Sequence, residues 1–316
     1  MSPGSRDEFS QEQQRLAKRG HYLRLRARMI QSIRRFFVEN EYLEVETPYL
    51  IPAPAPEPHI DAMSSGASYL HTSPELCMKR LLAAGYSRIF QISRCFRHGE
   101  RGDLHLPEFT ILEWYRAGID YMDLMEECER LISAVFSDMG AGQSIGYMGM
   151  QIGLKDRWER LSVSEAFARY ADMSLERALE RGSFDEVMVN QIEPNLGVTR
   201  PTFLHDYPAS LAALSRLKSD APGFAERFEI YIAGLELANG FSELTDVKEQ
   251  TERFEEQQRQ RIILGKRVYP MPERFLRSLE HMPEAAGIAL GVDRLAMILA
   301  GRPKIDDVVA FTPEEV

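Results

Sequence analysis

The order of apolar and polar positions predicts an amphipathic helix near the start of the chain. Across residues 21–39 apolar residues recur every three or four positions, as one face of a helix requires. The arginines of this segment then fall on the outer face. A solvated surface is the simpler interpretation of them, and a docking surface for an acidic partner is the alternative. The apolar positions are Leu25, Met29, Ile33, Phe36 and Phe37.

Short alternating segments elsewhere predict strands. A tight hairpin is indicated at Ala233-Gly234, which separates two alternating runs. A polar loop at 98–107 joins two other predicted strands, and the four prolines within 52–58 predict a stiff loop. The predicted strands lie at 43–48, 89–96, 108–115, 202–205, on both sides of the turn within 228–238, and at 287–291.

Capping residues mark the predicted helices. Ser73 precedes a helix with Pro74 at its first position, and Ser162 with Glu165 forms a capping box. Further helices are predicted at 183–192, at 247–264 and from about 293 onward. The stretch from about 140 to 200 is therefore expected to be a helical insertion. Strands without βαβ repetition predict an α+β fold with an antiparallel sheet flanked by helices, in a single domain over residues 1–316.

Composition and charge narrow the function classes. The 316 residues include 44% hydrophobic and 27% charged residues, which excludes a wholly disordered chain. The net charge of −10 argues against a surface built mainly for nucleic-acid phosphate. Residues 1–35 nevertheless carry nine basic and three acidic residues, a local excess of +6.

Cysteine usage and hydropathy indicate the compartment. Cys77, Cys95 and Cys128 lack CxxC spacing, so we expect three reduced thiols and neither a disulfide framework nor a zinc site. No run of 18 apolar residues occurs, and the first residues are polar. The expectation is a cytoplasmic protein without a membrane segment.

Charged residues concentrate on or beside three predicted strands, at 97–113, at 229–243 and at 293–294. Arginine offers a planar fork for phosphate oxygens, and carboxylates such as Glu229 and Glu236 suit Mg²⁺ when a nucleotide supplies the remaining ligands. An aromatic ring such as Phe109 can stack on adenine. Neither a P-loop nor a GxGxxG motif is present. Surface ion pairs are the simpler interpretation of each residue singly, and together they indicate a nucleotide-handling enzyme.

At these positions the sequence resembles the catalytic core of class II aminoacyl-tRNA synthetases. The resemblance is strongest to lysyl-tRNA synthetases and, within that group, to the free-standing elongation factor P–(R)-β-lysine ligases. It spans roughly residues 20–312. The matching segments are 43–48 (motif 1), 95–115 (motif 2), 287–295 (motif 3), and 72–75 with 236–246 (lysine pocket).

The resemblance implies a role for each matching residue. Arg97 would bind the α-phosphate and the substrate carboxylate, and Arg294 would hold the γ-phosphate, which makes these two the catalytic residues. The residues implied for ATP are Arg97, His98, Gly99, Glu100, His105, Leu106, Phe109, Glu236, Leu237, Gly291 and Arg294. Those implied for the lysine substrate are Ser73, Pro74, Glu75, Glu113, Tyr115, Asn239, Glu243 and Ala289. Mg²⁺ is expected on Glu229 and Glu236.

Three departures separate the chain from the synthetases it resembles. Gly99 and Leu106 stand where the family usually has Glu and Asn beside the nucleotide, and Ala289 stands where synthetases have Gly and the ligases have Ala. One methyl group in a tight pocket is typically worth ~1–3 kcal/mol of discrimination. Motif 1 begins by Leu43, which leaves too little preceding chain for a five-stranded OB-fold, so no anticodon-binding domain and no stable tRNA binding are expected.

These observations predict a two-step, ATP-dependent ligase. (R)-β-lysine, or lysine, would be activated as an adenylate and transferred to a lysine side chain of elongation factor P. A homodimer is expected, with the helix at 21–39 and the strand ending at Pro48 supplying apolar interface residues. A free-standing synthetase acting on tRNA or a small acceptor is one alternative, and a non-catalytic binding module that keeps the fold is another.

Overall fold

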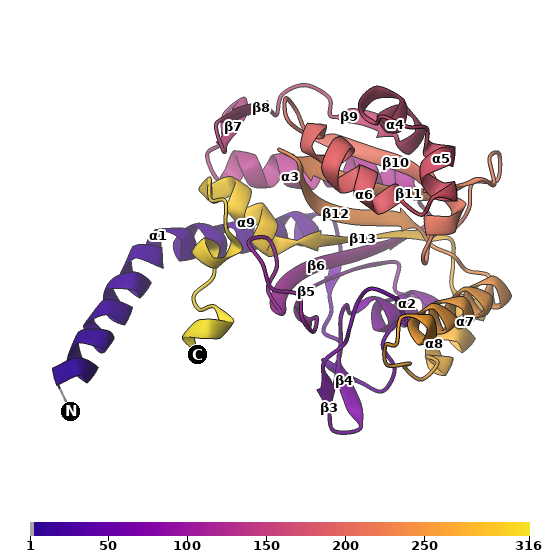
Figure 1. Ribbon diagram of the computed structural model, residues 1–316, viewed down its shortest axis with the longest axis horizontal. Coiled ribbons are helices and arrows are strands. Elements are labelled where there is room, and N and C mark those ends of the chain that lie inside the picture. Colours follow the sequence, from indigo (N-terminus) through magenta and orange to yellow (C-terminus); the bar gives the residue numbers. More distant parts are fainter. Residues whose placement is uncertain (1–2) are drawn as a thin grey trace.

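The computed structural model describes residues 3–316, with side chains from residue 12 onward, and is built around an eight-stranded sheet (Figure 1). The strand order is β1-β5-β6-β13-β12-β11-β10-β9. These strands are β1 (Leu43–Glu44), β5 (Arg88–Phe96), β6 (Glu108–Ala117), β9 (Glu159–Ser162), β10 (Thr202–Pro208), β11 (Phe224–Ile232), β12 (Leu235–Ser242) and β13 (Ala285–Gly291). A smaller three-stranded sheet contains β2 (Leu50–Ile51), β3 (Ser64–Ser65) and β4 (Ser68–Leu70). A two-stranded sheet contains β7 (Ser144–Tyr147) and β8 (Met150–Gly153).

Helices cover both faces of the sheet. They are α1 (Pro3–Glu39), α2 (Glu75–Ala83), α3 (Tyr121–Asp138), α4 (Val163–Tyr170), α5 (Leu175–Glu180), α6 (Phe184–Val187), α7 (Val247–Ile263), α8 (Glu273–Ser278) and α9 (Val292–Ala300). Among the residues described, no helix is long and apolar enough to cross a bilayer. The three cysteines are free thiols, as predicted.

The α+β prediction is confirmed, with one correction at the edges of the sheet. The five inner pairings are antiparallel, whereas β1 pairs with β5 and β9 pairs with β10 in parallel. A parallel partner requires a long crossover connection rather than a hairpin. Both edge pairs have one, since β1 reaches β5 through α2 and β9 reaches β10 through α4–α6.

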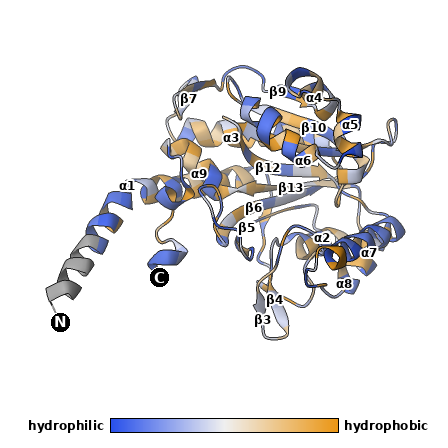
Figure 2. Cartoon of the chain, in the orientation of Figure 1, coloured by the Kyte–Doolittle hydropathy of each residue, from blue (hydrophilic) through white to orange (hydrophobic). Residues whose placement is uncertain are grey.

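Period-two alternation sends neighbouring side chains of the inner strands into two different layers. Phe90 and Trp114 point toward α1, α3 and α9, where Phe37 of α1 stacks on Phe90 with ring centroids 4.5 Å apart. Ile89 and Tyr115 point to the opposite face, toward α2 and α8. Figure 2 shows hydrophobic residues along α3 and α9, while α7 is largely hydrophilic.

Local predictions hold where the signal is local. The hairpin turn lies at Ala233-Gly234, and both residues have positive φ, as a tight hairpin of this twist requires. The capping box at Ser162 and Glu165 begins α4. The strand predicted at 43–48 is shorter, because pairing ends after β1 and resumes only at β2, with Pro48 between them.

The stretch from 140 to 200 is less helical than predicted. It contains α4, α5 and α6, but also the β7–β8 hairpin and strand β9, which joins the main sheet. The helices have an apolar cluster of their own, in which Phe167 and Leu175 pack with Leu204 and Tyr231 of the sheet. Four-residue strands carry too little alternation to be separated from short helices in a sequence.

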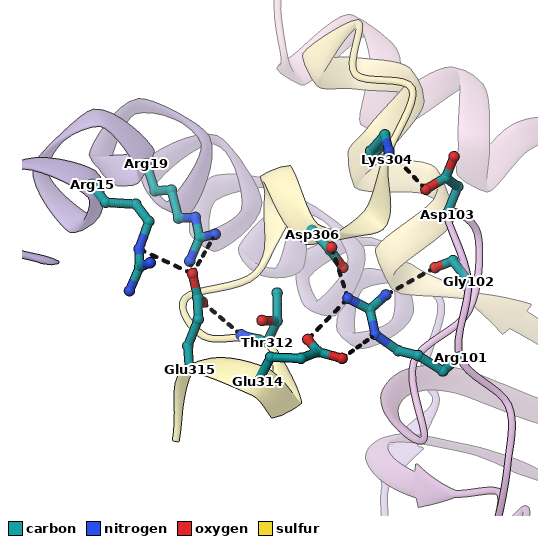
Figure 3. A network of polar contacts seen from close by, with 10 residues as sticks. All are labelled: Arg15, Arg19, Arg101, Gly102, Asp103, Lys304, Asp306, Thr312, Glu314 and Glu315. Carbon is teal, nitrogen blue, oxygen red and sulfur yellow. Dashed lines mark hydrogen bonds and ion pairs between the residues drawn. The ribbon is translucent and has the colours of Figure 1, made fainter.

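A network of ion pairs, here called the C-terminal clasp, fixes the loop at 98–107 (Figure 3). Arg101 contacts Asp306 at 2.8 Å and both carboxylate oxygens of Glu314 at 2.8 and 3.0 Å. The neighbouring Glu315 accepts from Arg19 of α1 at 2.6 Å. The C-terminal residues therefore bind the loop at 98–107, and α1 in turn binds the C-terminal residues.

Candidate active site

A cavity of about 550 Å³ opens on the face of the sheet opposite α1 and α3. Most of the predicted site residues line it: Ser73, Glu75, Arg97, Gly99, Glu100, His105, Leu106, Phe109, Glu113, Tyr115, Glu236, Leu237, Asn239, Ala289, Gly291 and Arg294. Four predicted residues do not: Pro74, His98, Glu229 and Glu243. Segments far apart in the sequence thus converge on one cavity.

The floor of the cavity belongs to a row of residues that are direct neighbours across five strands, and three members of this row, Glu113, Ala289 and Asn239, line the cavity. Gln91 pairs with Glu113, Glu113 with Ala289, Ala289 with Asn239, and Asn239 with Glu229. Directly paired residues point to the same side of a sheet. The methyl group of Ala289 therefore lies between a carboxylate and an amide, where a change of one carbon alters the width of the floor.

Glu113, on β6, is held by two hydroxyl donors. Ser73 donates to one of its oxygens at 2.6 Å and Tyr115 to the other at 2.9 Å. Ser73 also accepts from the backbone N–H of Glu75 at 2.9 Å. The predicted helix boundary is wrong by one residue, because α2 begins at Glu75 and Pro74, not Ser73, takes the cap position. Burial, followed by repulsion from Glu75, raises the pKa of Glu113 to about 8.

Lys79 provides a buried cation next to Glu75, which lines the cavity. Its ammonium lies 2.6 Å from Glu75, one turn earlier on α2, and 2.5 Å from Glu243 at the end of β12. Burial raises the pKa of Glu243 to about 8, although Lys79 opposes the rise. Burial alone would lower the pKa of Lys79, and Glu243 and Glu75 raise it instead. Glu243 is thus behind the cavity wall rather than on it.

Gly287 explains how Tyr115 and Glu243 can approach each other. A Cβ at this position would lie 2.2 Å from the Tyr115 ring and 2.6 Å from a Glu243 oxygen. Any side chain would force both functional groups away from the strand. The first glycine of the predicted motif 3 strand is therefore required by packing.

Arg97 and Arg294 line the same cavity. The guanidinium of Arg97 lies 4.9 Å from the centroid of the Phe109 ring and 3.7 Å from Glu100. Arg294 donates to the Glu236 backbone carbonyl at 2.7 Å and to His105 at 2.6 Å. Burial and the Arg294 charge lower the pKa of His105, so this ring is neutral and accepts from Arg294. The arrangement presents two cations to an anionic ligand.

Asp293, the residue before Arg294, is held by a residue that the sequence placed on the solvent face of α1. Arg26 pairs with Asp293 at 2.5 Å and donates to Thr110 at 2.8 Å. Asp293 in turn accepts from the Thr110 backbone N–H at 2.7 Å. The prediction that the arginines of α1 are all solvated is wrong for Arg26, because α9 and β6 cover that part of the helix.

Gly99 and Leu106, the two departures from motif 2, bring no polar side chain to the positions where the family usually has Glu and Asn. Gly99 has φ +79°, and nothing lies within 4 Å of the position of a Cβ. Leu106 is buried and packs into the main apolar cluster, so it offers no polar group to a nucleotide. His98 lies outside the cavity lining, and its backbone N–H donates to the Asp61 carbonyl at 2.6 Å.

The predicted metal ligands differ in how well they fit a cation. Glu229 accepts from Arg227 at 2.6 Å, Tyr207 at 2.5 Å and Tyr231 at 2.7 Å, so its oxygens are already engaged. Burial, followed by repulsion from Glu229, raises the pKa of Glu236, and a divalent cation would offset this repulsion. Within the described part of the chain, no three His, Cys, Asp or Glu side chains form a metal site of their own. Phosphate oxygens would have to complete the coordination.

Sequence reasoning missed three charged residues around the cavity: Glu57, Lys79 and Arg227. Glu57 lines the cavity from a proline-rich segment that had been interpreted only as a stiff loop. Lys79 shows an ordinary Glu–Lys spacing of one helical turn, which usually means a surface pair. Arg227 donates to Asn239 at 3.1 Å and was hidden among alternating strand residues.

Comparison of the amino-acid sequence with known proteins identifies the family of the chain. A family model described as tRNA synthetases class II (D, K and N) matches residues 11–315. A protein of Proteus mirabilis (strain HI4320) is 41% identical over 306 residues, 90% of this chain and 93% of that protein. A protein of Vibrio atlanticus (strain LGP32) is 38% identical over 307 residues, 92% of this chain and 94% of that protein. Both are named elongation factor P--(R)-beta-lysine ligase. The chain therefore belongs to the class II tRNA synthetase family (D, K and N), and it groups there with relatives named as elongation factor P ligases.

Proposed function

We propose that the chain is an ATP-dependent ligase that activates (R)-β-lysine as an adenylate and transfers it to a lysine side chain of elongation factor P. The observation that carries the proposal is a single cavity whose lining contains the arginines Arg97 and Arg294 together with the carboxylates of Glu75 and Glu113. A substrate with one carboxylate and two ammonium groups matches this distribution of charge. The names of the relatives supply the acceptor and the isomer.

In the first step, the substrate carboxylate attacks the α-phosphorus of ATP and pyrophosphate leaves. Arg97 binds the α-phosphate and the attacking carboxylate, and Arg294 holds the γ-phosphate. Phe109 stacks on the adenine with the ring face that is turned away from Arg97, since the Arg97 guanidinium lies over the other face. No side chain has to become covalently modified, since alignment and charge neutralisation lower the barrier. Mg²⁺, held by Glu236 and the phosphates, would neutralise part of the phosphate charge, and Glu229 would join only by releasing one of its present donors.

In the second step, the ε-amine of the acceptor lysine attacks the adenylate carbonyl and AMP leaves. During both steps Glu75 takes the substrate amino group nearer the carboxylate. The distal ammonium lies in the pocket lined by Glu113, Tyr115 and Asn239, and Glu243 acts on it from behind the pocket wall. Carboxylates left without a cation in this buried pocket are unfavourable, which selects for a substrate with two ammonium groups.

The experiment that tests the proposal compares acceptors directly. The purified protein is incubated with ATP, each lysine isomer, and either elongation factor P or tRNA, and the acceptors are weighed by mass spectrometry. We expect elongation factor P to gain one β-lysyl group and tRNA to remain unmodified. Efficient charging of tRNA with an unmodified protein factor would favour the free-standing synthetase instead. Since the acceptor is a translation factor, we place the reaction in the cytoplasm.

Ala289→Gly should improve activation of α-lysine relative to (R)-β-lysine. The methyl group lies between Glu113 and Asn239 in the floor of the cavity, so its removal widens the site where the two isomers differ. A change of about 10-fold in the ratio of kcat/KM values is expected for one methyl group. The measurement is pyrophosphate exchange with each isomer, and an unchanged ratio would remove Ala289 from the basis of selectivity.

Lysine binding should become tighter as the pH rises from 6 to 8. In the empty cavity Glu113 and Glu243 have pKa values of about 8, so near pH 6 both retain protons that a diammonium substrate must displace. These folded-state values lie above the ordinary value of a glutamate, so the bound protons stabilise the empty protein at low pH, and this stabilisation is lost as the pH rises through 8. We expect Kd to fall at least roughly tenfold over this range. Titration calorimetry in buffers of different ionisation enthalpy would also count the released protons, and a pH-independent Kd without proton release would contradict the prediction.

We propose that the chain forms a homodimer, with one correction to its expected interface. Met29, Ile33 and Phe37 of α1 are fully buried inside the chain itself and are not available to a partner. Exposed apolar side chains remain at Leu43 and Leu50, which are 49% and 53% exposed. A closed two-fold dimer is the commonest oligomer. Light scattering at micromolar concentration should give twice the 36.2 kDa of one chain, and a value of 36.2 kDa would exclude the dimer.

A further inference from the structure

Glu57 is a carboxyl group of the cavity to which the mechanism above gives no role. Glu57 lies in the loop between β2 and β3 and lines the same cavity as Arg97 and Glu75. Its backbone is fixed by Arg261 of α7, which is fully buried and donates to the Glu57 carbonyl at 2.6 Å and to the Ile60 carbonyl at 3.0 Å. A buried arginine thus holds the loop in place while the Glu57 side chain lines the site.

The other cavity carboxylates are engaged with protein partners. Glu75 pairs with Lys79, Glu113 accepts from two hydroxyl groups, and Glu236 contacts Arg294 at 3.4 Å. Glu100 lies 3.7 Å from Arg97, and Asp293 pairs with Arg26 at 2.5 Å. Among the residues that the structure describes, the Glu57 carboxyl has neither a hydrogen bond nor an ion pair within 4 Å. It is half-buried, so a ligand in the cavity can reach it.

The surroundings of Glu57 give it the acidity of a base that works near neutral pH. Burial raises the pKa of Glu57 to about 7, Arg97 opposes the rise, and Glu75 adds to it. The other charged groups that face it are Arg227, which lowers the pKa, and Glu100, which raises it. A general base is most effective when its pKa lies near the working pH.

The proposed second step requires such a base. The amine of a lysine side chain has a pKa near 10.4, so it arrives as an ammonium ion that cannot attack a carbonyl carbon. A hydroxyl acceptor, as on tRNA, carries no such extra proton. An enzyme that acylates an amine therefore needs a group that removes this proton inside the cavity.

We propose that Glu57 is the general base that deprotonates the acceptor lysine in the transfer step, an inference that rests on the proposed function. The Glu57 carboxylate takes one proton from the acceptor ammonium. The freed nitrogen lone pair forms the C–N bond, the bond between the carbonyl carbon and the phosphate oxygen breaks, and AMP leaves with that electron pair. The second nitrogen proton goes to water as the amide forms, and Glu57 releases its proton to solvent after the product leaves.

The test separates the two steps with the variant Glu57→Gln, which keeps the size of the side chain and removes the base. Lysine-dependent pyrophosphate exchange should stay within threefold of the unmodified protein. Single-turnover transfer from preformed adenylate to elongation factor P should slow by roughly 10²–10⁴-fold. The rise of the transfer rate with pH through about 7 should disappear. His59→Ala, at an exposed position of the same loop, is the matched control and should change neither step.

A parallel series with Nα-acetyl-lysine methylamide as acceptor distinguishes this inference from the proposed function. If the small amine is acylated and elongation factor P is not, the proposed acceptor is wrong, while the effect of Glu57→Gln is still read on the small amine. Equal slowing of exchange and transfer would make Glu57 a substrate-binding residue and overturn its role as a base. Unchanged transfer with an unchanged pH profile would overturn it as well, and so would failure of the unmodified protein to acylate any amine.

Discussion

Arg97→Ala and Arg294→Ala should each lower lysine-dependent pyrophosphate exchange by roughly 10²–10³-fold, the usual effect of losing one donor to a developing charge, about 3–4 kcal/mol. Arg97 Nε is buried without a partner in the protein, so the guanidinium is available to a ligand. Arg294 is held by the Glu236 carbonyl and His105, which fixes the direction in which its charge points. Arg101 is the one other arginine in the cavity lining, and its guanidinium is already bound to Asp306 and Glu314 of the clasp. Neither lost contact is therefore expected to be replaced.

Arg94→Ala is the matched control for this prediction. Arg94 lies on β5, three residues before Arg97, and its side chain is 48% exposed in a loose pair with Glu108. Loss of that contact should leave exchange unchanged, since exposed ion pairs contribute little. Exchange within threefold of the unmodified protein in both Arg97→Ala and Arg294→Ala would contradict their assigned roles.

Lys79→Met should destabilise the fold by about 3–5 kcal/mol, because it leaves two carboxylates beside a buried position that has lost its cation. Lys79 is only 1% exposed, so solvent cannot take over the role of the ammonium. The measurement is urea unfolding at several pH values. The raised pKa of Lys79 means that the ammonium keeps its charge throughout this pH range and loses it only above the ordinary lysine value.

The pH dependence of this deficit has a definite sign. Without Lys79, Glu243 has a still higher pKa, and at low pH a proton replaces the missing cation. The difference between the variant and the unmodified protein should therefore be smaller at pH 5.5 than at pH 8.5. Lys248→Met, at an exposed position of α7, is the control and should change stability by less than about 0.5 kcal/mol. A deficit below about 1 kcal/mol at pH 8.5 in Lys79→Met would exclude a structural ion cluster.

The parts of the fold that the sequence predicts are those that short segments determine. The turn at Ala233-Gly234 and the cap at Ser162 depend on the conformations of a few adjacent residues, and both are observed. The parallel edge pairs could not be predicted, because strands β1 and β9 are short and their partners lie far along the chain. Alternation of apolar and polar residues indicates that a strand exists, but it does not determine which strands pair with it in the sheet.

In the candidate site, too, local features could be predicted from the sequence and contacts between distant segments could not. Motif resemblance brings most of the expected residues into one cavity, but it gives no information on what covers each residue. Arg26 has the helical position of a surface residue, and only α9 and β6 show that it is enclosed. Lys79 looks like half of an ordinary helical ion pair until Glu243, on a distant strand, completes its burial. Glu57 belongs to no recognised motif. Its position in the cavity lining depends on the hydrogen bond between its backbone carbonyl and Arg261.

The C-terminal clasp has a consequence for the order in which the protein folds. Arg101 and Glu314 are 213 residues apart in the sequence, and Arg19 and Glu315 are 296 residues apart. Contacts between such distant residues close very large loops, so their entropic cost is recovered only after the intervening chain is compact. The loop that carries His105 toward the phosphates is therefore expected to become ordered after the sheet, so that the chain reaches a compact, native-like shape before it can bind a nucleotide.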